Sequence, residues 1–231
     1  MDFKKLINEG RYDSFTREIV KDIMFFIKET EGDLDDYDSF ELPYETTGED
    51  YYSHESGIEF DVDLRIKRTE DTITHGNREL PYHIHTYIAD DDALVMEIMI
   101  DETYGRKFYQ EMSYKINEDI RHEIEHYLQS KFKDRQQPII PNTSDYETTF
   151  AHHMDPSEVE ALVHGFYRRA KQEKKPLDVV MSDDIKQDIQ GGNLTPDEGD
   201  TILKTLIQYA VKKLPKAQYS SSFRRRFIVQ K

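Results

Sequence analysis

The chain has 231 residues, of which 36% are hydrophobic and 34% charged, and its formal net charge is −16. This length predicts one ordinary domain, or one domain with appendages, and the acidic charge argues against nonspecific nucleic-acid binding by the body of the protein. Cysteine is absent, which excludes disulfides, thiolate zinc ligands and cysteine nucleophiles and leaves the nine histidines as the natural metal ligands.

The first half of the chain predicts a helix followed by an antiparallel sheet. Apolar residues recur at helical spacing over residues 13–29, whereas residues 30–56 are acidic and rich in tyrosine, without a clear period, and we expect a long loop or insertion there. Residues 58–67 alternate strictly between apolar and charged side chains, which predicts a strand with one wet face. Residues 82–89 and 93–100, separated by three aspartates, predict a second and a third strand.

A helix is expected at residues 114–132, which contain neither glycine nor proline. Its apolar residues form one stripe at helical spacing: Ile116, Ile120, Ile124, Tyr127 and Leu128. The helix carries the segment His122-Glu123-Ile124-Glu125-His126, which matches HExxH, a signature of zinc hydrolases. Positions four apart stack on one face of a helix, so both imidazoles can reach one zinc ion while Glu123 points beside them as a general base. Because the histidines lie roughly opposite the apolar stripe, the alternative is a charged face in contact with solvent.

A zinc site of this kind needs a third protein ligand. The metzincin pattern would place a glycine and a histidine where the chain has Gln129 and Phe132, so that class is excluded. The gluzincin pattern takes a glutamate from a second helix, and Glu158 and Glu160 are the candidates.

The second helix begins after Asp155, which is a good N-cap and is followed by Pro156 at the first helical position. Glu158, three residues after the cap, completes a pattern similar to a capping box. Because the cap already explains Glu158, we favour Glu160 as the third ligand and keep Glu158 as the alternative.

These segments, HEIEHYLQ at residues 122–129 and PSEVEA at residues 156–161, resemble those of small gluzincin-type zinc metallopeptidases, including metallopeptidases encoded by tailed bacteriophages. The resemblance covers about a quarter of the chain. It implies His122 and His126 as zinc ligands, Glu123 as general base and Glu160 as third ligand. Where thermolysin-like relatives have an aspartate that supports a histidine ligand, this chain has His164, which is either an alternative ligand or a polar helix residue.

The connection between the two motif helices, residues 134–154, is long and aperiodic, as is typical of a functional loop or lid. It ends in His152 and His153, one of which could donate a hydrogen bond to the oxyanion of peptide hydrolysis; the alternative is a histidine with no role beyond the helix entry. Beyond it we expect a helix at residues 177–189, a break at two glycines, and a last amphipathic helix that begins after Thr195.

The end of the chain differs in charge from the rest. Residues 212–231 contain seven lysines or arginines and no acidic residue, so we expect a domain at residues 1–211 and a separate basic tail. Arg224, Arg225 and Arg226 either dock on an acidic protein or a phage particle, or the tail folds back onto the domain as a terminal strand.

The sequence therefore predicts an α+β, zincin-like fold: an N-terminal helix and a small antiparallel sheet, then the HExxH helix, a glutamate-bearing helix and C-terminal helices. The predicted function is a zinc-dependent metallopeptidase that acts on a protein or peptide. The alternative is a phage structural or interaction protein, a virion component, that docks through its basic tail. Because no segment reads as a signal peptide or a membrane span, we expect a location in the cytoplasm, of a host cell if a phage encodes the chain, or in the virion.

Overall fold

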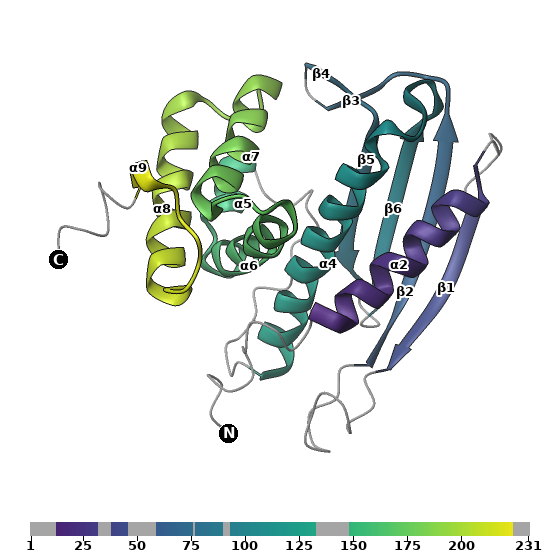
Figure 1. Ribbon diagram of the computed structural model, residues 1–231, viewed down its shortest axis with the longest axis horizontal. Helices are drawn as coiled ribbons and strands as arrows, with labels where there is room; N and C mark the ends of the chain where they lie inside the picture. Colours follow the sequence, from purple (N-terminus) through teal and green to yellow (C-terminus); the bar gives the residue numbers. More distant parts are fainter. Residues whose placement is uncertain are drawn as a thin grey trace. The chain divides into compact units, whose positions relative to one another are not determined.

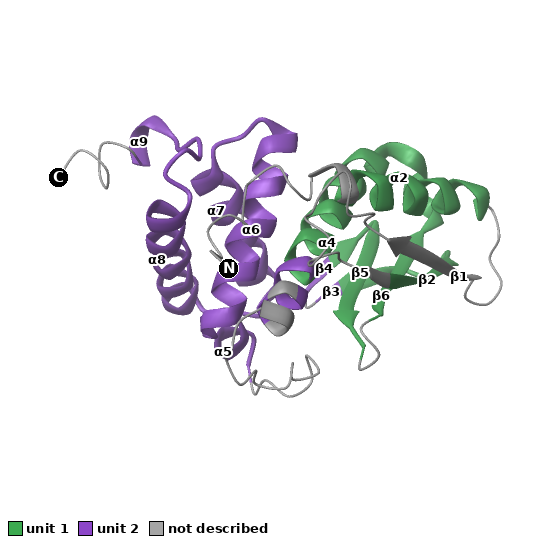
Figure 2. Ribbon diagram, turned by 90° about the horizontal axis from the view of Figure 1, so that it is seen from below, with its two compact units in different colours: residues 1–74, 79–123 green, residues 75–78, 124–231 purple. Residues whose placement is uncertain are grey.

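The computed structural model describes residues 13–31, 38–45, 59–75, 77–89, 93–132 and 148–223. The chain is α+β, as predicted, and divides into two compact units, which Figure 2 distinguishes by colour. The first unit comprises residues 1–74 and 79–123, and the second comprises residues 75–78 and 124–231. The division falls within one continuous helix, α4 (Tyr109–Phe132).

The first unit is built on a four-stranded sheet of order β1-β2-β6-β5 (Figure 1). Its strands are β1 (Asp38–Glu45), β2 (Glu59–Thr69), β5 (Tyr82–Ile88) and β6 (Leu94–Asp101). The two outer pairs are antiparallel, but β2 and β6 run parallel, so the predicted antiparallel sheet is in fact mixed. The short turn between β5 and β6 dictates an antiparallel pair, whereas the long segment between β2 and β6 leaves their relative direction open. A separate two-stranded sheet pairs β3 (Ile73–His75) with β4 (Arg78–Leu80).

Strand β1 corrects the prediction of a long loop at residues 30–56. It pairs with β2 along its whole length, from Asp38 opposite Ile66 to Glu45 opposite Glu59. Its sequence, DSFELPYE, alternates aromatic or aliphatic residues with others, but Pro43 weakens the strand signal. Proline is confined to edge strands because it cannot donate a ladder hydrogen bond, and β1 is an edge strand.

The core of the first unit lies between the sheet and two helices. Figure 1 shows α2 (Asp13–Glu29) and the first turns of α4 on the same face of the sheet. Helix α2 has the bounds that the sequence predicted, and α4 begins five residues earlier than predicted, after the 3₁₀ helix η1 (Glu102–Phe108). The core side chains are at most 1% exposed: Ile19, Ile23, Ile27, Val62, Leu64, Ile66, Met96, Ile98, Ile100, Met112, Ile116 and Ile120.

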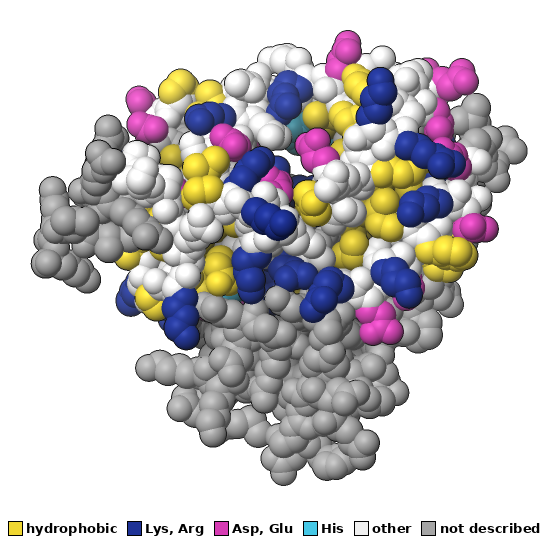
Figure 3. Space-filling model, viewed as in Figure 1, with side chains coloured by type: hydrophobic (Ala, Val, Ile, Leu, Met, Phe, Trp, Pro, Cys, Tyr) yellow, Lys and Arg dark blue, Asp and Glu magenta, His cyan; other side chains and the backbone are white. Residues whose placement is uncertain are grey.

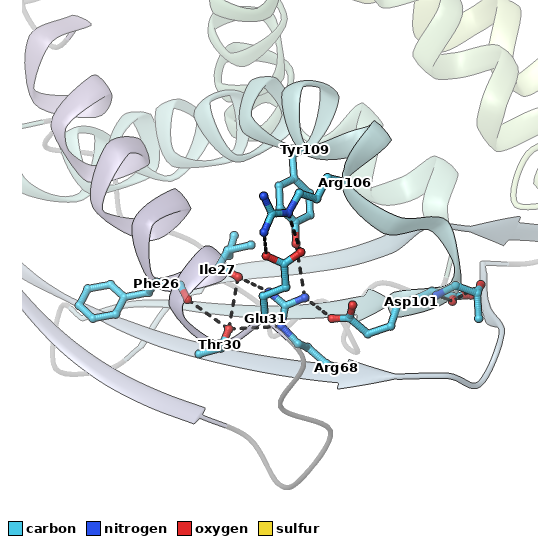
Figure 4. A network of polar contacts seen from close by, with 10 residues as sticks. Phe26, Ile27, Thr30, Glu31, Arg68, Asp101, Arg106 and Tyr109 are labelled. Atoms are coloured by element: carbon cyan, nitrogen blue, oxygen red, sulfur yellow. Dashed lines mark hydrogen bonds and ion pairs between the residues drawn. The ribbon is translucent and has the colours of Figure 1, made fainter.

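Arg68, at the end of β2, ties the C-terminal end of α2 to the sheet (Figure 4). Its guanidinium donates to the carbonyl of Ile27 and to the carboxylate of Glu102, and its Nε lies 3.3 Å from the Thr30 hydroxyl. Arg68 is 2% exposed, and its partners supply both the negative charge and the acceptors that a buried guanidinium needs. The carbonyl of Ile27 is one of the groups that a helix end leaves without an intrahelical partner, so Arg68 acts as a cap for α2.

In the described residues, the second unit contains the end of α4 and five further helices. These are α5 (Thr149–Met154), α6 (Pro156–Glu173), α7 (Leu177–Gly191), α8 (Pro196–Lys213) and α9 (Ser221–Phe223). Their apolar faces share one core, whose innermost residues include Val163, Phe166, Met181, Ile202 and Leu206. Among the described residues, no helix is both long and apolar enough to cross a membrane.

The predicted starts of α6 and α8 are confirmed. Asp155 is the N-cap of α6 and accepts from the backbone N–H of Ser157, with Pro156 at the first helical position. Thr195 and Glu198 form a complete capping box at α8. Helix α7 ends at the predicted glycine pair, where Gly192 has a φ of 81°, in the left-handed region that glycine adopts without strain.

The segment after α8 packs on the second unit. Tyr219 and Phe223 are 5% and 6% exposed, and their rings stack with centroids 5.2 Å apart. The predicted domain boundary at residue 211 falls inside α8, and Arg224, Arg225 and Arg226 lie outside the described residues. On the face seen in Figure 3, lysine and arginine side chains lie among acidic and hydrophobic ones. Docking through the tail therefore stays a prediction.

Candidate metal centre

Helix α4 presents two buried faces. Four residues of the predicted apolar stripe are confirmed as buried, since Ile116, Ile120, Ile124 and Tyr127 are 0%, 0%, 1% and 8% exposed. The side chain of the fifth, Leu128, lies outside the described part of the structure. Much of the other face is buried as well. Asp119 and His122 are partly buried, and five of its polar residues are at most 8% exposed: Glu118, Arg121, Glu125, His126 and Gln129. The alternative of a charged face in contact with solvent is therefore wrong, because polar side chains of this face contact residues of α6.

His126 contacts a glutamate of α6. Its Nε2 lies 3.2 Å from Oε2 of Glu158, and the two residues are 5% and 4% exposed. His122 precedes His126 by one turn on the unbroken helix α4, so local helix geometry sets it beside His126. Three ligand atoms lie within 4.8 Å of one another, one each from His122, His126 and Glu158. Two imidazoles and one carboxylate are a donor set that zinc binds in catalytic sites.

Gln129 fixes the tautomer of His126. Its amide Nε2 lies 3.2 Å from the carbonyl oxygen of Ser157 and 3.3 Å from Oε2 of Glu160, so it donates to both acceptors. Its Oε1 then faces Nδ1 of His126, at 3.3 Å, and Nδ1 must be the donor. In a neutral imidazole the lone pair therefore lies on Nε2, which faces the carboxylate of Glu158.

That arrangement requires a positive charge between His126 and Glu158. A lone pair and a carboxylate oxygen repel each other at 3.2 Å, unless a proton or a metal cation lies between them. Metal-binding histidines commonly donate their other ring N–H to a carboxylate, carbonyl or water that fixes the ring. Here the amide of Gln129 occupies that position.

The prediction made Glu160 the third ligand, whereas the structure groups Glu158 with His122 and His126. Glu158 does not close a capping box, because the backbone N–H of Asp155, which a capping box would use, donates to the carbonyl of His152 at 3.1 Å. The carboxylate of Glu158 is thus directed toward His126 instead.

Glu160 contacts Gln129 and Tyr209. Its Oε1 accepts from the hydroxyl of Tyr209 at 2.6 Å, and its Oε2 from Gln129 at 3.3 Å. A chain of hydrogen bonds therefore runs from Tyr209 through Glu160 and Gln129 to His126. Glu160 also belongs to a second group of ionisable side chains, with Glu125 and His164.

Glu123 lies beside the first histidine of the motif. A carboxylate oxygen of Glu123 is 3.9 Å from Nε2 of His122, and the residue is 8% exposed. The same helix thus places this carboxylate and the two histidines.

The two histidines at the end of the long connection have different surroundings. Nε2 of His152 lies 3.6 Å from Oε2 of Glu158. Burial lowers the pKa of His152 below its ordinary value, although the carboxylate of Glu158 opposes the shift. His153 instead lies 2.8 Å from the carbonyl of Thr149 through Nδ1 and 3.8 Å from Asp188 through Nε2. His152 is thus beside the candidate ligands, whereas these contacts direct His153 toward α5 and α7.

Sequence reasoning missed two residues of this centre. In the sequence, Gln129 spoke against a metzincin and closed the segment that resembles gluzincins, but it was given no role, although its position three residues after His126 puts the two side chains on one helix face. Tyr209 offered no signal, because it is 49 residues away from Glu160 along the chain.

Comparisons with known proteins add no relative. No protein-family model matches the chain, and neither the curated proteins nor the solved structures contain a match.

Proposed function

We propose that the chain is a zinc-dependent metallopeptidase with a gluzincin-like, zincin-type fold, in which His122, His126 and Glu158 bind zinc and Glu123 is the general base. The observation that carries the proposal is the pair His126 and Glu158, in which a histidine oriented by Gln129 directs Nε2 at a buried carboxylate 3.2 Å away. A divalent cation satisfies both atoms, and His122 on the same helix face completes the donor set.

Glu158 takes the place of Glu160 as the proposed third ligand. Glu160 is held by Tyr209 and Gln129, which makes it the outer support of His126. Replacing Glu158 should therefore remove a zinc ligand, whereas replacing Glu160 should leave all three ligands in place and weaken the hydrogen bonds that orient His126.

The chain's own residues supply the proton chemistry. When bound, zinc acts as a Lewis acid that polarises a substrate carbonyl and makes water more acidic. Glu123 takes a proton from the attacking water and returns it to the leaving amine. His152, whose Nε2 lies 3.6 Å from Glu158, offers a hydrogen-bond donor for the oxyanion.

The experiment compares the zinc-loaded full chain with its Glu123→Gln variant on a mixed peptide library, with mass spectrometry of the products. We expect wild type to cleave and Glu123→Gln to retain zinc but lose about 100-fold or more in kcat, because the amide keeps the shape and cannot take a proton. Glu111→Gln, an exposed position on the same helix, is the matched control and should cleave as wild type does. If zinc-loaded wild type leaves every peptide intact, the proposal fails and an interaction protein becomes the better interpretation.

A further inference from the structure

A second group of ionisable side chains lies entirely within the second unit. Glu125 comes from α4, and Glu160 and His164 lie one turn apart on α6. One ligand atom of each lies within 4.8 Å of the others. The three residues are 0%, 8% and 6% exposed, so this is a buried cluster and not an acidic surface patch.

This combination of side chains suits a divalent cation. Two carboxylates and one imidazole whose ligand atoms lie this close are donors that first-row divalent ions bind. A divalent ion would bind both acids and the imidazole at one centre. An alternative source of positive charge is the pair of arginines one turn away on each helix, Arg121 and Arg168, which are both 8% exposed.

The geometry of Glu160 resembles that of a supported metal ligand. Its two oxygens accept from two different donors, Tyr209 at 2.6 Å and Gln129 at 3.3 Å. Metal-binding carboxylates are commonly held by such outer hydrogen bonds, and each carboxylate oxygen can still accept a second partner. His164, four residues later, is on the same face of α6 as Glu160.

From this arrangement we propose a second divalent-metal site formed by Glu125, Glu160 and His164. Carboxylate oxygens suit manganese and imidazole suits zinc, so the ligand is a divalent first-row transition ion. The site shares no ligand with His122, His126 and Glu158, but Gln129 hydrogen-bonds to both groups. Occupation of the second site would hold Glu160, and through Gln129 the ring of His126, in the orientation that the first site needs.

The test is metal content by inductively coupled plasma mass spectrometry, after the full chain is loaded with zinc, or in a separate sample with manganese, and desalted. We expect two equivalents in wild type and one each in His164→Asn and Glu158→Gln, with none in the double variant. Glu125→Gln repeats the test of the second site from the other helix, and circular dichroism checks that each variant is folded. His83→Asn, exposed on β5, should keep both equivalents.

The outcomes separate this site from the proposed zinc centre. One equivalent that is lost in Glu158→Gln and kept in His164→Asn overturns the second site and leaves the first intact. One equivalent that is kept in Glu158→Gln and lost in His164→Asn supports the second site and removes the basis of the proposed function. Two equivalents that survive in both His164→Asn and Glu125→Gln place the second ion elsewhere and overturn the site, and metal-free wild type overturns both.

Discussion

At the scale of single residues, the candidate centre depends on an amide. Gln129 connects His126 to Glu160, and its donors fix which imidazole nitrogen carries the proton. The histidine spacing in the sequence indicated where metal could bind, but the state of the ring depends on partners that are distant in the sequence, Ser157 and Glu160.

We expect Gln129→Leu to weaken zinc binding about 10- to 100-fold, as is typical when the outer partner of a metal-binding histidine is removed. Leucine has a similar volume and no hydrogen-bonding groups, so Nδ1 of His126 loses its acceptor. Competition with a chromophoric chelator measures the affinity.

Gln110→Leu, an exposed change on the same helix, is the control and should leave the affinity unchanged. An unchanged affinity in Gln129→Leu would show that the amide does not orient the ligand.

The choice between Glu158 and Glu160 could not be made from the sequence. The spacing of a capping box accounted for Glu158, yet the decisive backbone N–H, that of Asp155, is satisfied by the last turn of α5. That short helix lies in a segment with no periodic pattern, so the sequence did not predict that the carbonyl of His152 would accept from Asp155. His122, His126 and Glu123 were predictable because one helix places all three.

At the scale of elements, the long periodic segments were predictable from the sequence, whereas the pairing of the strands was not. Helix α2 and the starts of α6 and α8 follow from apolar spacing and caps. The pattern of a strand does not specify its neighbours in the sheet. Packing across the sheet decides that β2 pairs with β6 in parallel and that β1 lies at the edge.

Arg68 joins two such elements, and we expect Arg68→Met to lower the free energy of unfolding by about 3 kcal/mol, because the carboxylate of Glu102 and the carbonyl of Ile27 lose their buried donor. Urea unfolding followed by circular dichroism measures the change.

The matched control is Arg65→Met on the same strand. Arg65 pairs with Glu97 at 2.9 Å, but its side chain is 41% exposed, so this change should cost at most about 1 kcal/mol. Equal losses in the two variants would contradict the capping role of Arg68.

At the scale of the whole molecule, charge composition suggested a tail that begins at residue 212, whereas the structure packs Tyr219 and Phe223 into the second unit. Two aromatic residues among serines and basic residues form too short an apolar pattern to predict this packing. Hydrogen bonds to α7 hold the segment: the carbonyl of Gln218 accepts from the backbone N–H of Leu177 at 2.8 Å, and Asp178 accepts from the backbone N–H of Ser220 at 2.7 Å.

This packing predicts a loss of stability in alkali. Burial, and then the charge of Asp178, raise the pKa of Tyr219 to about 12 from an ordinary value of 10. Because the folded state disfavours the phenolate, the contribution of Tyr219 to stability is complete below pH 10 and is lost as the pH rises from 10 to 12.

Tyr219→Phe removes the ionising group, so the free energy of unfolding should fall less steeply over that range than in wild type. Denaturant titrations at a series of pH values measure the slope. Identical slopes would mean that Tyr219 ionises as freely in the folded chain as in the unfolded one.

The most direct test of the proposed zinc centre is an anomalous difference map, at the zinc edge, from crystals of the zinc-loaded protein. We expect a peak about 2.0–2.2 Å from Nε2 of His126, from a ring nitrogen of His122 and from a carboxylate oxygen of Glu158. A peak bound by His122, His126 and Glu160 instead, or no peak beside His126 in zinc-saturated crystals, would contradict it.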